Sequence, residues 1–93
     1  MDQVAHRHSS HPAIAKRLKR ANGHLRSVIE MIETGRPCLD IAQQLQAVEK
    51  AIAQAKKTLI HDHLGHCLDE AALPAASGAR KSIGEFKEIA KYL

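Results

Sequence analysis

The stretch PCLDIAQQLQAVEKAIAQAKKTLIHDHLGHCLDEAA, from Pro37 to Ala72, decides the fold of this chain. Its apolar and small residues recur at alternating steps of four and three, which predicts one face of a long α-helix. Proline at the first helical position favours a helix start, because its missing N–H has no partner there in any helix. The apolar seam consists of Ile41, Leu45, Val48, Ile52, Ala55 and Leu59.

Three candidate ligands for a soft metal lie on the same face of this helix: Cys38, His63 and Cys67. At 100° per residue, the 25 steps from Cys38 to His63 and the 29 steps to Cys67 both end within about 20° of the starting direction. His63 and Cys67 are one turn apart and can share a metal ion. The helical rise puts Cys38 roughly 37 Å from His63, so the three cannot meet within one helix.

A second, antiparallel copy of the helix would bring the two ends together. The centre of symmetry then falls near residues 51–53, where small side chains allow close approach. We therefore expect an antiparallel homodimer with two equivalent sites, each built from Cys38 of one chain and His63 and Cys67 of the other. Two-fold symmetry is the commonest geometry of oligomers.

Shorter helices are expected on both sides of the long one. The first runs from Pro12 to about Thr34, with Ser9 or Ser10 as its cap and Gly35 as its stop. The loop Gly35-Arg36 is so short that the first two helices should form an antiparallel hairpin, and two hairpins would make a four-helix bundle. The fold class is thus all-α, with a three-helix protomer. The last helix runs from Ala79 to Tyr92, with an apolar face formed by Ile83, Phe86, Ile89, Ala90 and Leu93.

Length and composition predict a single small domain. The chain has 93 residues and two cysteines. We expect a flexible histidine-containing arm over residues 1–11 and one helical domain over residues 12–93. A core this small is marginal alone, and oligomerisation is a usual remedy. The polar opening has no secretory signal and no stretch suits a membrane span, so we expect a cytoplasmic protein whose cysteines are metal ligands or redox sensors.

The formal net charge of +4 suggests nucleic acid, an acidic partner or an anionic surface. Cations crowd the first half of the first helix, as a phosphate-contacting face would require. A merely solvated face is the alternative. No paired carboxylates, phosphate-binding glycine loop or zinc-finger spacing appears, so neither an enzyme nor a small-molecule substrate is expected. The cations are Lys16, Arg17, Lys19, Arg20 and Arg26.

Three motifs together resemble the CsoR/RcnR family of bacterial metal-sensing transcriptional repressors. They are RLKRANGHL (17–25), Cys38 followed by IAQQLQAVEKA, and HDHLGHC (61–67). The resemblance implies the helical dimer, usually paired again into a flat D2 tetramer. It also implies that the metal-free protein binds a G/C-rich operator and releases it when the inducer binds, which turns on an efflux gene.

Family branches differ in their ligands, and the resemblance predicts Ni(II) or Co(II) as the inducer here. Cobalt and nickel sensors add a histidine 32 residues before the cysteine, which is the spacing of His6 from Cys38. Copper sensors usually carry a tyrosine where this chain has Pro37. Cu(I) is the alternative, because Cys38, His63 and Cys67 match the copper sensors and Glu85 could fill the role of their supporting glutamate. His61 is expected to support the ligands or pack beside them.

For DNA, the resemblance points to Arg17, with Lys16, Lys19 and Arg20 nearby and Lys57 in place of an arginine that is Gln54 here. Three less favoured alternatives stay open. A persulfide sensor would lack His63. A formaldehyde sensor would have proline after Met1 and no thiol at position 67. A metal-buffering protein with no DNA role would need the same ligands without the cationic helix.

Overall fold

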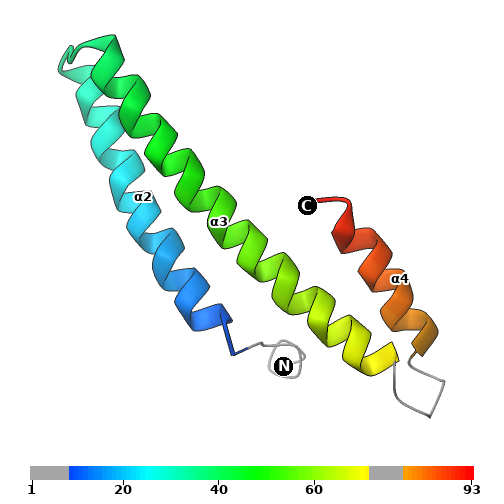
Figure 1. Ribbon diagram of the computed structural model, residues 1–93. Coiled ribbons are helices and arrows are strands. Elements are labelled where there is room, and N and C mark those ends of the chain that lie inside the picture. The colour runs from blue at the N-terminus through cyan, green and yellow to red at the C-terminus, as the bar shows by residue number, and fades with distance from the viewer. Residues whose placement is uncertain (1–8, 72–78) are drawn as a thin grey trace. The chain divides into compact units, whose positions relative to one another are not determined.

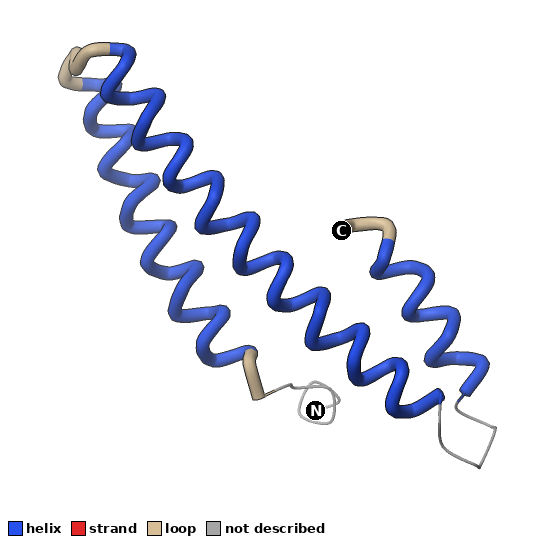
Figure 2. The backbone as a smooth tube through the Cα atoms, in the orientation of Figure 1, coloured by secondary structure: helices blue, strands red, loops and turns tan. Residues whose placement is uncertain are grey.

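The computed structural model describes residues 9–71 and 79–93 of the chain (Figures 1 and 2). These residues form three helices and no strand: α2 His11–Glu33, α3 Cys38–Ala71 and α4 Ala79–Ala90. The prediction of an all-α, three-helix chain is confirmed. Residues 12–56 form one compact unit, and the described residues 9–11, 57–71 and 79–93 belong to a second one.

Gly35 ends α2 in the way its position predicts. Its φ of 74° lies in the left-handed region, which glycine adopts without the steric cost of a Cβ atom. The Arg36 N–H donates to the Met31 carbonyl at 2.9 Å, and the Gly35 N–H donates to the Ile32 carbonyl at 3.2 Å. This pair of bonds is a Schellman motif, and it satisfies carbonyls that the last turn of α2 would otherwise leave open.

Pro37 lies one position earlier in its helix than predicted. α3 begins at Cys38, and the Pro37 carbonyl accepts the first helical bond from the Ile41 N–H at 3.1 Å. Pro37 is therefore the capping residue of α3. This shift by one position changes the free energy of folding little. Neither a capping residue nor the first helical residue donates a backbone hydrogen bond within the helix, so proline suits both positions.

In the hairpin unit, α2 and the first part of α3 lie side by side (Figure 1), and the residues buried between them follow a seven-residue repeat. α2 buries Ile14, Ala21 and Val28, and α3 buries Val48 and Ala55. A repeat of seven keeps side chains on one stripe of each helix. His24 adds a polar link across the hairpin, since its Nε2 lies 2.6 Å from the Gln44 Oε1.

The predicted seam of α3 is only partly buried in this structure. Val48 and Ala55 face the core, whereas Leu45 and Ile52 remain 42% and 45% exposed. The buried and the exposed residues of the seam follow the same 3–4 spacing. Such a seam covers a stripe of the helix that is wide enough to face two neighbours. The exposed set is therefore free to pack against something other than the hairpin itself.

The second unit joins the end of α3 to α4. Its buried side chains are Ile60 and Cys67 from α3 and Ser82 from α4. The expected apolar face of α4 is partly wrong, because Ile83 is 48% exposed and the inward stripe instead starts one residue earlier, at Ser82. α4 ends in tightened turns, where the Tyr92 N–H donates to the Ile89 carbonyl at 3.0 Å. Within the described residues, no helix is both long and apolar enough to cross a membrane.

Candidate metal centre

His63 and Cys67 project from one face of α3, as predicted. They follow Ile60 by three and seven residues, so the stripe that carries Ile60 into the core also carries both donors toward α4. Cys67 is 1% exposed and His63 is half-buried. Both cysteines of the chain are thiols, not disulfides. A buried thiol one turn from an imidazole is a chelating pair for a soft or borderline metal.

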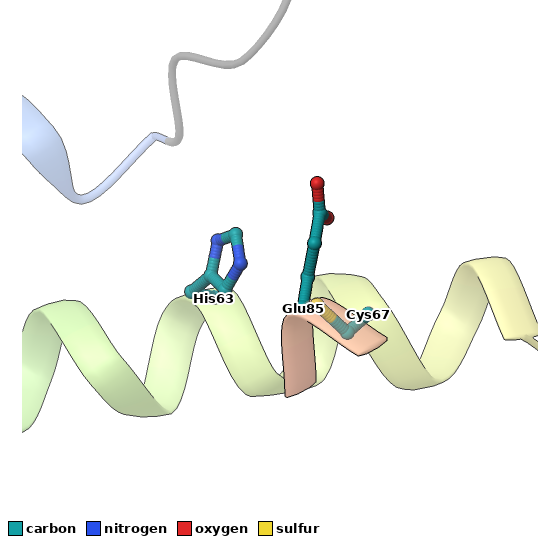
Figure 3. A group of neighbouring side chains, drawn as sticks. All are labelled: His63, Cys67 and Glu85. Atoms are coloured by element: carbon teal, nitrogen blue, oxygen red, sulfur yellow. The ribbon is translucent and has the colours of Figure 1, made fainter. Parts of the chain in front are cut away.

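Glu85 of α4 completes a group of three donors (Figure 3). The imidazole of His63, the thiol of Cys67 and the carboxylate of Glu85 each offer an atom, and these atoms lie within 4.8 Å of one another. The sequence assigned Glu85 only a supporting role. The structure brings an oxygen of its carboxylate within 4.8 Å of a donor atom of each of the two α3 residues.

An open cleft of about 740 Å³ gives solvent access to His63 and Glu85 of this group. Its walls come from α3, from α4 and from Tyr92 beyond the end of α4, so an ion can reach His63 and Glu85 from outside the chain. Lys81 and Tyr92 of this wall were not predicted as part of a site, since their own spacing carries no ligand signal. The lining residues are His63, Lys81, Gly84, Glu85, Glu88, Ile89 and Tyr92.

Cys38 is not part of the donor group. It is the first residue of α3, it is exposed, and it belongs to the unit of residues 12–56. The group found among the described residues takes its donors from the other unit alone. A Cys-His-Cys set was predicted to need two chains, and no single-chain group of that composition is seen in residues 9–71 and 79–93.

Two more histidines of α3 lie within three residues of His63, and one further predicted ligand is His6. His61 is exposed, and its supporting role stays a prediction. His66 is half-buried, with its ring centroid 6.4 Å from that of His63. His6 lies outside the described residues.

A hydrogen bond that the sequence did not predict fastens the start of α2 beside this centre. The Ser10 hydroxyl donates to the Asp62 carboxylate, and Asp62 directly precedes His63. The two residues are 52 positions apart, so no local pattern could have paired them. The bond links the residue before α2 to the turn of α3 that carries the imidazole.

α2 presents a cationic surface, as its sequence predicts. All five of its basic residues in positions 16–26 are exposed, and α2 has no acidic residue before Glu30. Lys57 of α3 is exposed as well. Such a density of cations without balancing carboxylates suits contact with phosphates. The five residues are Lys16, Arg17, Lys19, Arg20 and Arg26.

Candidate metal donors on a helical chain with an exposed cationic helix are the features expected of a metal-responsive DNA-binding protein. Comparison with known proteins agrees, since the model of the family described as metal-sensitive transcriptional repressors matches residues 10–92. The chain belongs to this family, so it is a metal-sensing transcriptional repressor. No solved structure gives a significant match.

Several relatives are identical to this chain at about a third of the aligned positions. The copper-sensing transcriptional repressor CsoR of Mycobacterium ulcerans is 35% identical over 80 residues, which cover 86% of this chain and 67% of the relative. The copper-sensing repressor RicR of Mycobacterium tuberculosis is 35% identical over 71 residues, 76% of this chain and 74% of the relative. The copper-sensing CsoR of Bacillus subtilis is 35% identical over 78 residues, 84% and 75% respectively.

These relatives contradict the prediction of Ni(II) or Co(II) as the inducing metal. All three are named as copper sensors, which agrees with the alternative, Cu(I). The nickel prediction depended on His6 and on Pro37 in place of a tyrosine. The donors Cys38, His63 and Cys67 suit either metal, so they do not distinguish Ni(II) or Co(II) from Cu(I).

Proposed function

We propose that this chain is a Cu(I)-responsive repressor, which binds operator DNA without metal and releases it when Cu(I) binds between two chains. The family membership, the copper-sensing relatives and the donors present all support this proposal. A repressor family also gives no reason to expect catalysis. Operator binding would place the protein in the bacterial cytoplasm.

The observation that carries the proposal is the division of the donors. His63 and Cys67 lie together in one unit, whereas the exposed Cys38 lies in the other. Cu(I) is a soft ion that is satisfied by two thiolates and one imidazole. Cys38 of one chain, with His63 and Cys67 of a second, would supply that set. His61 and Glu85 would support these ligands from outside the Cu(I) coordination sphere.

The exposed apolar surface of the hairpin unit supports the assembly. A cleft of about 420 Å³ there is lined by Leu25, Leu45, Val48, Glu49 and Ile52. Exposed apolar patches on a small protein mark interaction surfaces, and a second copy would cover this one. We propose an antiparallel four-helix-bundle dimer, paired into a D2 tetramer, with the domain spanning residues 12–93 behind an arm of residues 1–11.

The cationic surface of α2 would contact the operator, which we expect to be G/C-rich. Arg17, Lys16, Lys19 and Arg20 would contact phosphates or groove edges, with Lys57 adding to them from α3. Metal can release DNA only if it binds one arrangement of the chains more tightly than the arrangement that DNA prefers. A site built from two chains meets this condition, because filling it fixes one chain against the other.

Mixed dimers test the division of donors directly. Cys38→Ala and Cys67→Ser chains, each with a different affinity tag, should separately lose tight Cu(I) binding. The Cys38→Ala chain keeps His63 and Cys67, and the Cys67→Ser chain keeps Cys38. A mixed dimer therefore regains one complete site and should bind one Cu(I) tightly.

Dimers of two differently tagged Cys38→Ala chains serve as the control and should not bind Cu(I) tightly. Circular dichroism should show unchanged helix content in each variant. If the mixed dimer binds Cu(I) no better than this control, the donors do not come from two chains and the proposed site is wrong.

A further inference from the structure

We infer that His63, Cys67 and Glu85 form a second, single-chain metal site, which takes Zn(II) and does not use Cys38. It shares two donors with the copper site but adds a carboxylate where copper would require a second thiolate. The site itself needs only the geometry of one chain. Its separation from the copper site rests on the proposed function.

The donor geometry is close to what Zn(II) requires. Zinc bonds of about 2.0–2.3 Å in a tetrahedral arrangement place the donors of one ion about 3.5 Å apart. The donor atoms of His63, Cys67 and Glu85 already lie within 4.8 Å of one another without an ion. Glu85 is exposed, so a change in its side-chain torsions can close the remaining gap of about an ångström without disturbing the core.

The identity of the third donor decides which metal the site accepts. A thiolate and a carboxylate carry two negative charges, which balance a divalent ion. Zn(II) accepts sulfur, nitrogen and oxygen together and keeps water in a fourth position when three protein ligands bind it. Cu(I) is soft and monovalent, and it gains little from a carboxylate oxygen. Glu85 therefore favours Zn(II), and Cys38 favours Cu(I).

The surroundings allow such an ion to enter and to be hydrated. All three donors belong to the same compact unit, and His63 and Glu85 line the open cleft of about 740 Å³. His63 and Cys67 are held by α3 and Glu85 by α4, so the ion would fasten the two helices to each other (Figure 3). Because His63 and Cys67 serve both sites, Zn(II) and Cu(I) exclude each other on the same pair of donors.

Glu88 provides a matched control for Glu85. Both are exposed glutamates of α4 that line the cleft, but Glu88 is absent from the donor group and its carboxylate lies 3.0 Å from the Lys91 ammonium. Glu85→Gln and Glu88→Gln remove the same charge from the same helix. Only the first removes a donor.

The test titrates the reduced full-length protein without oxygen, using Zn(II) against a chromophoric chelator and Cu(I) against a Cu(I)-selective one. Wild type, Cys38→Ala and Glu88→Gln should each bind one Zn(II) per chain with the same affinity. Glu85→Gln should bind Zn(II) at least ~10-fold more weakly, since losing even an indirect partner of a ligand costs about that much. Its Cu(I) affinity should fall by less than its Zn(II) affinity, because in the proposed copper site Glu85 supports the ligands but does not bind the ion. X-ray absorption should find one sulfur on the bound zinc.

Two results would overturn the inference. Equal Zn(II) affinity in Glu85→Gln and Glu88→Gln would show that the carboxylate is not a ligand. Loss of Zn(II) in Cys38→Ala, or two sulfurs on the zinc, would show that zinc uses the two-chain site. Failure of the copper proposal looks different, since Cys38→Ala would then keep its Cu(I) affinity whatever happens to Zn(II).

Discussion

Replacing Arg17 by alanine should flatten the salt dependence of operator binding. Each phosphate that a cation neutralises contributes about 0.9 to the slope of log K against log salt. α2 exposes five cations per chain in positions 16–26, so two chains on one operator can contribute a slope of up to about 9. Arg17→Ala removes one cation per chain, or two per dimer, and should make the slope shallower by about 2.

Fluorescence anisotropy with a labelled G/C-rich operator measures this slope at a series of salt concentrations. A change of about 2 in slope alters the relative affinity about 16-fold over a fourfold rise in salt, which the assay resolves easily. Arg36→Ala is the matched control. It removes the same charge from the exposed loop before α3, where Arg36 lies 3.8 Å from Asp40.

The control variant should keep the wild-type slope, because its guanidinium is not on α2 and is already partly balanced. If Arg17→Ala and Arg36→Ala change the slope equally, the effect comes from net charge alone and α2 is not the DNA-contacting surface. If Arg17→Ala keeps the wild-type slope, Arg17 does not contact the phosphates of the operator.

Two further pairs of substitutions test the turn of the hairpin and the proposed dimer interface. Gly35→Ala should destabilise the protein by about 1–2 kcal/mol in chemical unfolding, because alanine resists the φ of 74°. Gly23→Ala, where an added Cβ meets nothing among the described residues within 4 Å beyond its own turn of α2, should instead stabilise it by up to about 1 kcal/mol, and equal effects would contradict the assignment of the turn. Ile52→Asp should weaken self-association at least ~10-fold in sedimentation, since burying an unpaired charge costs several kcal/mol. Gln43→Asp, on the opposite side of α3, should not weaken self-association. If Ile52→Asp leaves self-association unchanged, the dimer interface does not include this face of α3.

The helices could be predicted from the sequence because their boundaries depend on local chemistry. Gly35 supplies the one positive φ in the described residues, and Pro37 cannot continue a preceding helix. Periodicity also placed His63 and Cys67 on one face, since 3.6 residues per turn fixes their relation. These features need no knowledge of what the helix packs against.

Tertiary features were harder to predict. The seam of α3 could not reveal that Val48 would be buried in the hairpin and Ile52 left exposed, because both have the same spacing. Ser10 and Asp62 meet across 52 positions without a pattern. Glu85 approaches His63 and Cys67 because α4 turns the face that carries Ser82 inward.

The metal was predicted wrongly for a chemical reason. Cys38, His63 and Cys67 suit more than one thiophilic ion, so the choice depended on a fourth donor. His6 was selected for its spacing alone, and spacing cannot show whether a side chain reaches a site. The copper-sensing relatives supplied the information that the donor types lack.

Titration of the metal-free repressor with Cu(I), in the presence of its labelled operator, tests the central claim most directly. We expect one Cu(I) per chain to bind, with DNA release complete at that ratio in wild type and absent in Cys38→Ala. Both proteins should bind the operator equally well before metal is added. Release of DNA by Cys38→Ala at the same Cu(I) ratio as wild type would contradict the two-chain copper site.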